Sequence, residues 1–294
     1  RDGVMQLRRT MLFIPGNNPA MLQNGGVFGA DSVILDLEDA VAPNEKDAAR
    51  YLVSHALRTV DYGESEKTVR INPLDTFAAQ DIPLIVASGP DALVVPKVES
   101  AEDICQVAAM VEKAEKPGQK PVKLIALLET PKGIAEAGRI AVAHPRVDAL
   151  ALGAEDYTAA LGAARTKEGQ EIYTARTLLI NAAAAAGIQS IDTPFTDAND
   201  ETGLLADTRL AKALGFKGKL SINPRQIDAI HSIFNPTALD VDWAEQVIEA
   251  IQRAEAEGSG VASLGGKMVD APVVQRAQSV LHLARRLGMV AEQG

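Results

Sequence analysis

The chain has 294 residues, of which 47% are hydrophobic and 23% charged, so it can bury one large core or two ordinary ones and is not a disordered chain. A net charge of −10 and an aromatic content of 4% disfavour nucleic acid and anionic membranes as partners. The single cysteine, Cys105, excludes an intramolecular disulfide framework and a cysteine-based zinc site. Without a signal-peptide pattern or an apolar run of about 18 residues, we expect a soluble, cytoplasmic protein.

Eight short apolar runs follow one another along most of the chain, and we predict a strand in each. They are rich in Val, Ile or Leu, and most lack alternation with polar residues, which is typical of strands covered on both faces. The runs are TMLFIPG (10–16), SVILDLED (32–39), TVRINP (68–73), ALVVPKVE (92–99), KLIALLET (123–130), ALALGAED (149–156), QSIDTPF (189–195) and KLSINP (219–224).

The segments between these runs have the spacing of amphipathic helices. After Ser100, for example, apolar residues stand at Ile104, Val107, Ala108 and Val111, a period of about 3.6 residues. A strand, a loop and a helix, repeated eight times, predict an α/β protein with a (β/α)8 TIM barrel. A doubly wound sheet is the alternative, but the glycine fingerprint GxGxxG is absent from the strand-to-helix turns.

Two extra C-terminal helices are predicted after the eighth unit, at 240–257 and 272–288. We therefore place the barrel at residues 1–235 and a helical extension at 236–294. The segment 258–270 between the two helices contains four glycines and ends in Lys267 and Asp270. It is either a linker or a lid over the mouth of the barrel.

Charged and polar side chains gather where the predicted strands end, and in a TIM barrel these ends form the mouth that carries the active site. Carboxylates outnumber cations there, so their repulsion predicts a divalent cation acting beside the basic side chains. Without HExxH or HxH spacing, zinc is disfavoured, and Mg²⁺, or Mn²⁺, held by carboxylates and waters is favoured. The strand-end residues are Asp36, Glu38, Asp39, Arg70, Asn72, Lys97, Glu99, Glu129, Glu155, Asp156, Asp192 and Asn223.

Glu129 and Asp156 are the candidate metal-binding pair, because each stands at the end of one of two adjacent strands just before a helix. Capping of the following helix is the alternative role for either acid. Gly153 allows a close approach of the backbone. The N–H groups from Gly153 through Ala154 to Glu155 are therefore candidates to hold a substrate carboxylate.

Two cations within the predicted strands have two interpretations each. Arg70 either forms a salt bridge to a barrel carboxylate, or grips a substrate carboxylate and stabilises a developing enolate. Lys97 either pairs with Asp36 or Glu38, or acts as a Schiff-base nucleophile, although the surrounding acids favour its protonated form. We count Arg70 and Glu38 among the candidate catalytic residues.

Other reactive residue types receive no chemical role. Cys105 is expected on the apolar side of a helix, as a core residue. Arg8 and Arg9 precede the first strand, and we expect them to be solvated, with a phosphate contact to a carrier or coenzyme as the alternative. The histidines lie in predicted helices or at their ends, away from the strand ends; they are His55, His144, His231 and His282.

The order of several short motifs resembles the citrate lyase β-subunit family. The motifs cover nearly the whole chain and occur in the family's order, which by chance is very improbable. They are RRTMLFIPGN (8–17), DLEDAV (36–41), RIN (70–72), PK (96–97), ET (129–130), GAEDY (153–157), DT (192–193), SINPRQI (221–227) and GKMVDAP (266–272).

This resemblance implies a Mg²⁺-dependent (β/α)8 enzyme that cleaves or forms a carbon–carbon bond next to a thioester. By the resemblance, Glu129 and Asp156 are the metal ligands and Arg70 grips the 2-oxo acid. Asp270 matches a catalytic acid or base that, in oligomers of the family, reaches over the barrel of a neighbouring subunit. We therefore expect a homo-oligomer, such as a homotrimer.

Within the family, the expected substrate is a citryl thioester on an acyl carrier protein, cleaved to oxaloacetate and an acetyl thioester in a complex with a citrate lyase α subunit. The alternative is a stand-alone lyase or synthase of malyl-, citramalyl- or methylmalyl-CoA. The segment 196–203 and the GKMVDAP motif favour the first reading. A Schiff-base aldolase using Lys97 and a non-catalytic subunit of a complex are the remaining alternatives.

Overall fold

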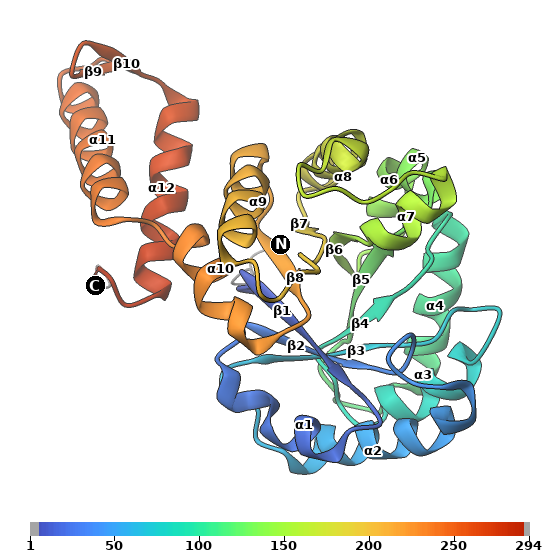
Figure 1. Ribbon diagram of the computed structural model, residues 1–294. Coiled ribbons are helices and arrows are strands. Elements are labelled where there is room, and N and C mark those ends of the chain that lie inside the picture. The colour runs from blue at the N-terminus through green and yellow to red at the C-terminus, as the bar shows by residue number, and fades with distance from the viewer. Residues whose placement is uncertain (1–5, 291–294) are drawn as a thin grey trace. The chain divides into compact units, whose positions relative to one another are not determined.

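The computed structural model describes residues 6–290, and its first unit, up to His231, contains a closed barrel of eight parallel strands (Figure 1). Each strand pairs with its neighbours in the sequence, and the eighth pairs with the first. The (β/α)8 TIM barrel is thus confirmed, and every predicted strand run overlaps one strand. The strands are β1 (Thr10–Pro15), β2 (Ser32–Asp36), β3 (Glu66–Arg70), β4 (Ala92–Val95), β5 (Lys123–Leu128), β6 (Val147–Leu152), β7 (Gln189–Asp192) and β8 (Gly218–Ser221).

Alternation along the strands sorts their side chains into two apolar layers. On β2, Ile34 belongs to the cluster inside the barrel, whereas Val33 and Leu35 belong to the cluster between strands and helices. The interior is therefore a packed core, and inward-facing polar groups are left at its two ends. The inner cluster comprises Met11, Ile34, Ala92, Val94, Ile125, Leu127, Ala149, Ala151, Ile191 and Leu220.

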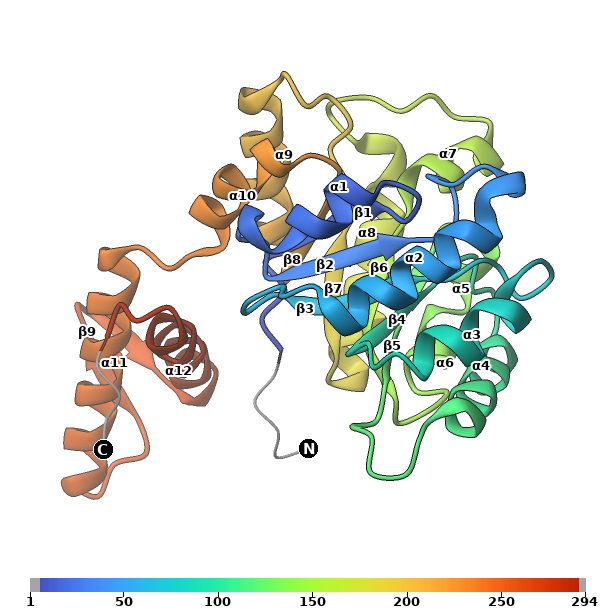
Figure 2. The same ribbon diagram turned by 90° about the horizontal axis from the view of Figure 1, so that it is seen from below.

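Helices surround the barrel from outside (Figures 1 and 2). Polar caps fix where several of them begin: Ser100 and Asp103 form a capping box on α4, and Thr130 caps α5. The helices are α1 (Pro19–Asn24), α2 (Lys46–Thr59), α3 (Ala78–Val86), α4 (Ala101–Ala114), α5 (Pro131–Ala135), α6 (Ala137–Ala141), α7 (Ala154–Leu161), α8 (Tyr173–Ala186), α9 (Glu201–Leu214) and α10 (Ile227–Phe234). Short 3₁₀ turns are η1 (Gly25–Phe28), η2 (Pro43–Glu45), η3 (Gln170–Ile172) and η4 (Pro224–Gln226).

An ion-pair cluster closes the amino-terminal end of the barrel. Arg8 donates hydrogen bonds to Glu66 on β3 and Gln189 on β7, and its Nη1 lies 2.8 Å from Asp148 on β6. Both Arg8 and Arg9 are buried, so the predicted solvated face is wrong. A phosphate contact gains no support either, because their guanidinium groups are engaged by carboxylates of the protein.

A second buried network ties β7 and β8 to the helices outside them. Arg176 on α8 and Lys219 on β8 each contact both Asp192 on β7 and Asp207 on α9, at 2.6 to 2.9 Å. Two cations balance two carboxylates, and all four side chains are buried. Asp192 therefore faces the helices and not the mouth, contrary to the sequence-based expectation.

The second unit, Ser232–Gly294, includes the last three residues of α10 and is built on its own apolar cluster. Its elements are α11 (Ala238–Ala256), β9 (Ala262–Leu264), β10 (Lys267–Val269) and α12 (Ala271–Arg286). The glycine-rich segment forms an antiparallel hairpin, and its left-handed turn residues are Gly265 and Gly266. The ends of the two predicted domains, 1–5 and 291–294, lie outside the described residues.

Cys105 is exposed on α4, so the prediction of a core residue is wrong. The apolar face of α4 is formed by Ile104, Val107, Ala108 and Val111, and the cysteine lies one position beside it. Within residues 6–290, no helix is both long and apolar enough to cross a bilayer.

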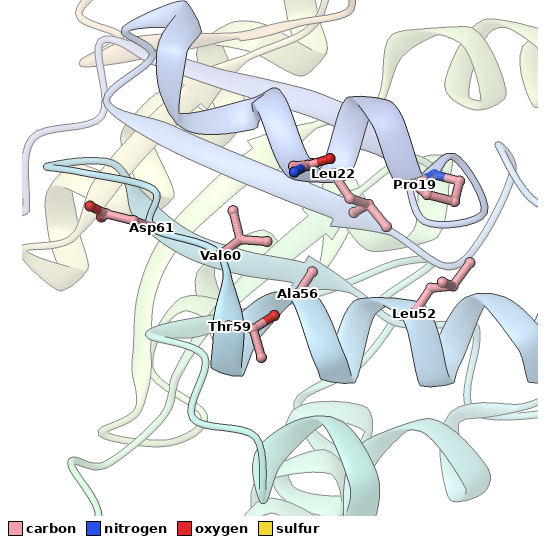
Figure 3. A pocket seen from close by; sticks show the side chains of 8 residues that line it. Pro19, Leu22, Leu52, Ala56, Thr59, Val60 and Asp61 are labelled. Carbon is pink, nitrogen blue, oxygen red and sulfur yellow. The ribbon is translucent and has the colours of Figure 1, made fainter.

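A groove of about 440 Å³ lies on the outer surface between α1 and α2 (Figure 3). Pro19 and Leu22 line it from α1, and Leu52 and Ala56 line it from α2. None of the predicted site residues is in its lining.

Candidate functional site

Arg70 is the central cation at the carboxyl end of the barrel. As the last residue of β3 it lies level with Asp36 on β2, and it donates two hydrogen bonds to that carboxylate, at 2.6 and 2.7 Å. Its Nη1 lies 2.9 Å from Glu38 and 3.3 Å from Asp39, and its guanidinium stacks over the ring of Phe13. The salt bridge to a barrel carboxylate, one of the two interpretations from the sequence, is therefore present.

Glu38 is a buried carboxylate with few partners. It follows β2 with the same inward phase as Asp36, and it is 4% exposed. Although Arg70 and the Nζ of Lys97 lie near its oxygens, neither oxygen accepts a hydrogen bond of regular geometry from the described residues. Burial raises the pKa of Glu38 to about 7, and the neighbouring cations only partly oppose this. Such a carboxyl can take up or release a proton near neutral pH.

Glu129 follows β5 and is the second buried carboxylate at this end of the barrel. Its Oε1 accepts the backbone N–H of Lys97 at 2.8 Å. Lys97 has a φ of 52°, the one positive value at a non-glycine residue among residues 6–290. Burial, followed by the charge of Glu38, raises the pKa of Glu129 to about 8. A desolvated carboxylate of this kind is stabilised by a bound cation.

Asp156 lies in the first turn of α7 and not on a strand, because β6 ends at Leu152. Its side chain is about half exposed, and its Oδ2 is 4.0 Å from the Nζ of Lys97. The ammonium of Lys97 also lies 3.5 Å from Glu38, so its predicted pairing with Glu38 is confirmed. Lys97 thus stands between the carboxylates of Glu38 and Asp156, and its backbone holds Glu129.

The backbone N–H groups at the start of α7 are the predicted donors to a substrate carboxylate. The N–H of Gly153 is donated to the carbonyl of Leu128 at 2.9 Å, and that of Ala154 to Thr193 Oγ1 at 3.1 Å. Both N–H groups therefore have an acceptor within the protein, and their contact with a substrate carboxylate stays a prediction. Glu155 lies in the first helical turn, where backbone N–H groups have no acceptor within the helix. Its exposed side chain pairs with Arg165.

The donor set fits magnesium better than a transition metal. No ready-made group of three or more His, Cys, Asp or Glu side chains is close enough to enclose an ion in the described part of the chain. Glu129 and Asp156 offer carboxylate oxygens from neighbouring βα units, one buried and one open to water. Mg²⁺ commonly binds to one or two carboxylates and keeps several waters, so this pair suits it.

Three other predicted strand-end residues have structural partners. Asn72 bonds to Asp81 on α3, Asn223 caps η4, and Glu99 pairs with Lys132 at 3.4 Å. The sequence reasoning missed Thr193 and Phe13. Thr193 follows the last residue of β7, and this position is the signal that could have revealed it.

Asp270 belongs to the second unit. It caps α12, where its Oδ1 accepts the N–H of Val273 at 3.3 Å. Asp270 lies between β10, which ends at Val269, and α12, which begins at Ala271, so these two elements fix the position of its backbone.

Comparisons with known proteins identify the family of this chain. The family model described as HpcH/HpaI aldolase/citrate lyase matches residues 9–224, which include the whole barrel up to the end of β8. The chain belongs to this family. Citrate lyase subunit beta of Leuconostoc mesenteroides subsp. cremoris is 48% identical over 98% of this chain and 97% of that protein. The resemblance to the citrate lyase β-subunit family is thereby confirmed.

Two further family members show its range. L-malyl-CoA/beta-methylmalyl-CoA lyase of Cereibacter sphaeroides is 34% identical over 95% of both chains. The structure of a citrate lyase beta subunit from Mycobacterium tuberculosis, complexed with oxaloacetate and magnesium, is 32% identical with a TM-score of 0.68. That match covers 79% of this chain and 100% of the other. The family therefore includes lyases named for citrate and lyases named for coenzyme A thioesters.

Proposed function

We propose that this chain is a magnesium-dependent carbon–carbon lyase that cleaves a citryl thioester to oxaloacetate and an acetyl thioester. The observation that carries the proposal is the position of Glu129. Its carboxylate is buried after the end of β5 and has a pKa of about 8, and it accepts the backbone N–H of Lys97, whose ammonium lies 4.0 Å from Asp156. Support also comes from the relative named citrate lyase subunit beta and from the related structure with oxaloacetate and magnesium.

Glu129 and Asp156 would hold Mg²⁺, with Mn²⁺ as a substitute. When bound there, the ion supplies a Lewis acid that polarises the hydroxyl and a carboxylate oxygen of the substrate. The chain's own groups then have separate tasks. Arg70 is held by Asp36 through Nε and Nη2, and its Nη1, beside Glu38 and Asp39, is the proposed donor to the 2-oxo acid. The backbone N–H groups of Gly153, Ala154 and Glu155 are the proposed donors for a substrate carboxylate, and that of Glu155, in the first turn of α7, has no acceptor within the helix.

Glu38 is the group best suited to accept the hydroxyl proton. Its pKa near 7 leaves much of it ionised at neutral pH, and its oxygens lack regular hydrogen-bond donors. Loss of that proton lets the carbon–carbon bond break, and the electron pair moves to the thioester carbonyl as an enolate. Arg70, 2.9 Å from Glu38, is the nearest cation to the charge that develops. Asp270 is proposed to protonate the enolate carbon from a neighbouring subunit of a homotrimer.

The Schiff-base alternative is weak on chemical grounds. Burial lowers the pKa of Lys97, but the charges of Glu38 and Asp156 outweigh this and leave the pKa raised. An amine that stays protonated is a poor nucleophile towards a carbonyl.

The carrier of the thioester is the finer part of the proposal. An acyl carrier protein and a citrate lyase α subunit are the proposed partners, on the strength of the 48% identical relative. The relative named for malyl-CoA favours a second candidate, a stand-alone lyase of coenzyme A thioesters.

A cleavage assay on the purified chain tests both candidates. Citryl-, citramalyl- and malyl-CoA are offered with Mg²⁺, the released keto acid is measured, and each run is repeated with EDTA. Turnover of one substrate that EDTA abolishes supports a metal lyase and names its acyl group. EDTA-resistant turnover contradicts the metal role. Turnover only when citryl-acyl-carrier protein and an α subunit are added supports the citrate lyase complex.

A further inference from the structure

One residue, Lys97, contacts the three acids of the barrel on which the proposed function depends. Its backbone N–H is donated to Glu129 Oε1 at 2.8 Å, and its Nζ lies 3.5 Å from Glu38 Oε1 and 4.0 Å from Asp156 Oδ2. The backbone and the side chain of Lys97 therefore serve different acids. The ammonium contacts are long, and the side chain is 45% exposed, so it is held loosely.

Arg70 cannot perform the same task. Its guanidinium is fixed by two short hydrogen bonds to Asp36 and is buried under the mouth. Its Nη1 lies 2.9 Å from Glu38, so Arg70 offsets part of that charge, but among the described residues the ion pair of Asp156 is with Lys97. Without a metal, Lys97 is therefore the cation that Glu38 and Asp156 share, and it reduces the repulsion between them.

We propose that the Lys97 ammonium is a built-in counter-cation, which occupies the carboxylate cluster in the metal-free protein and moves out when a divalent cation binds at Glu129 and Asp156. This inference rests on the proposed function. An ammonium about 4 Å from Asp156 and a dication on the same carboxylate repel each other strongly. Lys97 therefore competes with the metal and sets how tightly it binds.

The backbone conformation allows this exchange without disturbing Glu129. Lys97 has a left-handed φ of 52°, and its N–H is donated to the Glu129 carboxylate in a bond that does not depend on the side chain. The ammonium can leave through the exposed side of the mouth while the N–H stays in place. The same separation makes a clean variant possible, because Lys97→Met removes the charge and keeps the N–H donor.

The test is calorimetric titration of Mg²⁺ into the metal-free, full-length protein. We expect Lys97→Met to bind Mg²⁺ about ten-fold more tightly than the wild type, and Lys97→Arg to stay close to it. Lys132→Met is the matched control, because Lys132 is also an exposed lysine that pairs with one carboxylate, Glu99. Its Mg²⁺ affinity should not change.

Thermal unfolding gives a second readout that needs no substrate. Metal-free Lys97→Met should melt below the wild type, and Mg²⁺ should raise its melting temperature by more than it raises that of the wild type. If Lys97→Met is poorly folded, Lys97→Gln, which keeps a polar side chain, takes its place. Equal or weaker Mg²⁺ binding by a folded, uncharged variant overturns the inference alone. Absence of Mg²⁺ binding by the wild type overturns the proposed metal site and the inference together.

Discussion

Gly153 lies directly against the carboxylate side chain of Glu129. A β-carbon added at Gly153 would stand 2.6 Å from Glu129 Cβ and 2.8 Å from its Oε2, both closer than side-chain carbons come in real structures. Because the N–H of Gly153 is bonded to Leu128 on β5, the backbone there has little freedom to move away. We therefore expect Gly153→Ala to displace Glu129 and to lower Mg²⁺-dependent cleavage roughly 100-fold.

A matched control for this variant is Gly138→Ala. Gly138 lies in α6, and a β-carbon there meets no atom within 4 Å. Alanine should therefore leave activity unchanged and raise stability slightly, since it favours a helix more than glycine does. Wild-type activity in a folded Gly153→Ala protein would show that the position of Glu129 is not critical.

Substitution of the two proposed metal ligands should affect stability differently, because Glu129 is buried and Asp156 is half exposed. Glu129→Gln is expected to reduce Mg²⁺ affinity and cleavage at least about 100-fold, because it removes the buried charge. Asp156→Asn should do the same with no loss of stability, since its side chain is half exposed. Calorimetric Mg²⁺ titration and the cleavage assay are the measurements. Unchanged turnover in both variants would contradict the metal assignment.

The stability of the metal-free protein should depend on the ionisation of Glu38. Its pKa is about 7 in the fold, above the ordinary value of 4.5, because it is buried. The folded protein therefore binds more protons than the unfolded chain in this interval. The contribution of Glu38 to the free energy of unfolding should be fully present below about pH 4.5. It should be lost as the pH rises through 7, a decrease of the order of 3 kcal/mol.

Denaturant melts in EDTA across this pH range check the prediction. Glu38→Gln should make the slope shallower, because glutamine does not titrate, while Glu129, whose pKa is also raised, keeps its own contribution. An unchanged slope in that variant would assign the effect to another group.

The buried quartet outside β7 and β8 should be sensitive to the loss of one member. Lys219→Met leaves Asp192 and Asp207 with only Arg176 to offset their charge, so we expect a loss of about 3–5 kcal/mol in the free energy of unfolding. Lys217→Met, an exposed position two residues earlier, is the control and should have little effect. Equal stability of the two variants would argue that the quartet is not a major source of stability.

Asp270→Asn tests the proposed acid or base in the second unit. Asparagine still caps a helix, so α12 should stay folded while the proton donor is lost. We expect kcat to fall about 100-fold or more with little change in binding of the 2-oxo acid. If Asp270 serves a neighbouring barrel, mixing inactive Asp270 and Arg70 variants should restore some activity. No recovery despite proven subunit exchange would place the whole site within one chain.

Much of the barrel could be predicted from the sequence because its strands are short apolar runs at regular spacing. Strand ends were less certain. At 149–156 the apolar run continues into α7, since Ala154 begins a helix as readily as it continues a strand. The environment of Arg70 was predicted only as two options, because its bonds to Asp36 depend on the register of two strands.

Burial of charge was the harder part to predict. Arg8 and Arg9 looked like surface residues, but their carboxylate partners come from distant parts of the chain. The position of Asp192 near the end of a predicted strand suggests a residue at the mouth. Ile191, however, points into the barrel, so its neighbour Asp192 points outward to the helices. Such partners become visible only when the barrel closes.

The ion-pair cluster around Arg8 determines from which end of the barrel small molecules can approach its interior. Arg8 spans from β1 to β3, β6 and β7 at one end, and apolar side chains fill the space above it. The barrel is consequently closed at its amino-terminal end, and small molecules can approach its interior only from the carboxyl end. Under the proposed reaction, the substrate would therefore enter and both products would leave at the carboxyl end, where Arg70 and Glu129 lie.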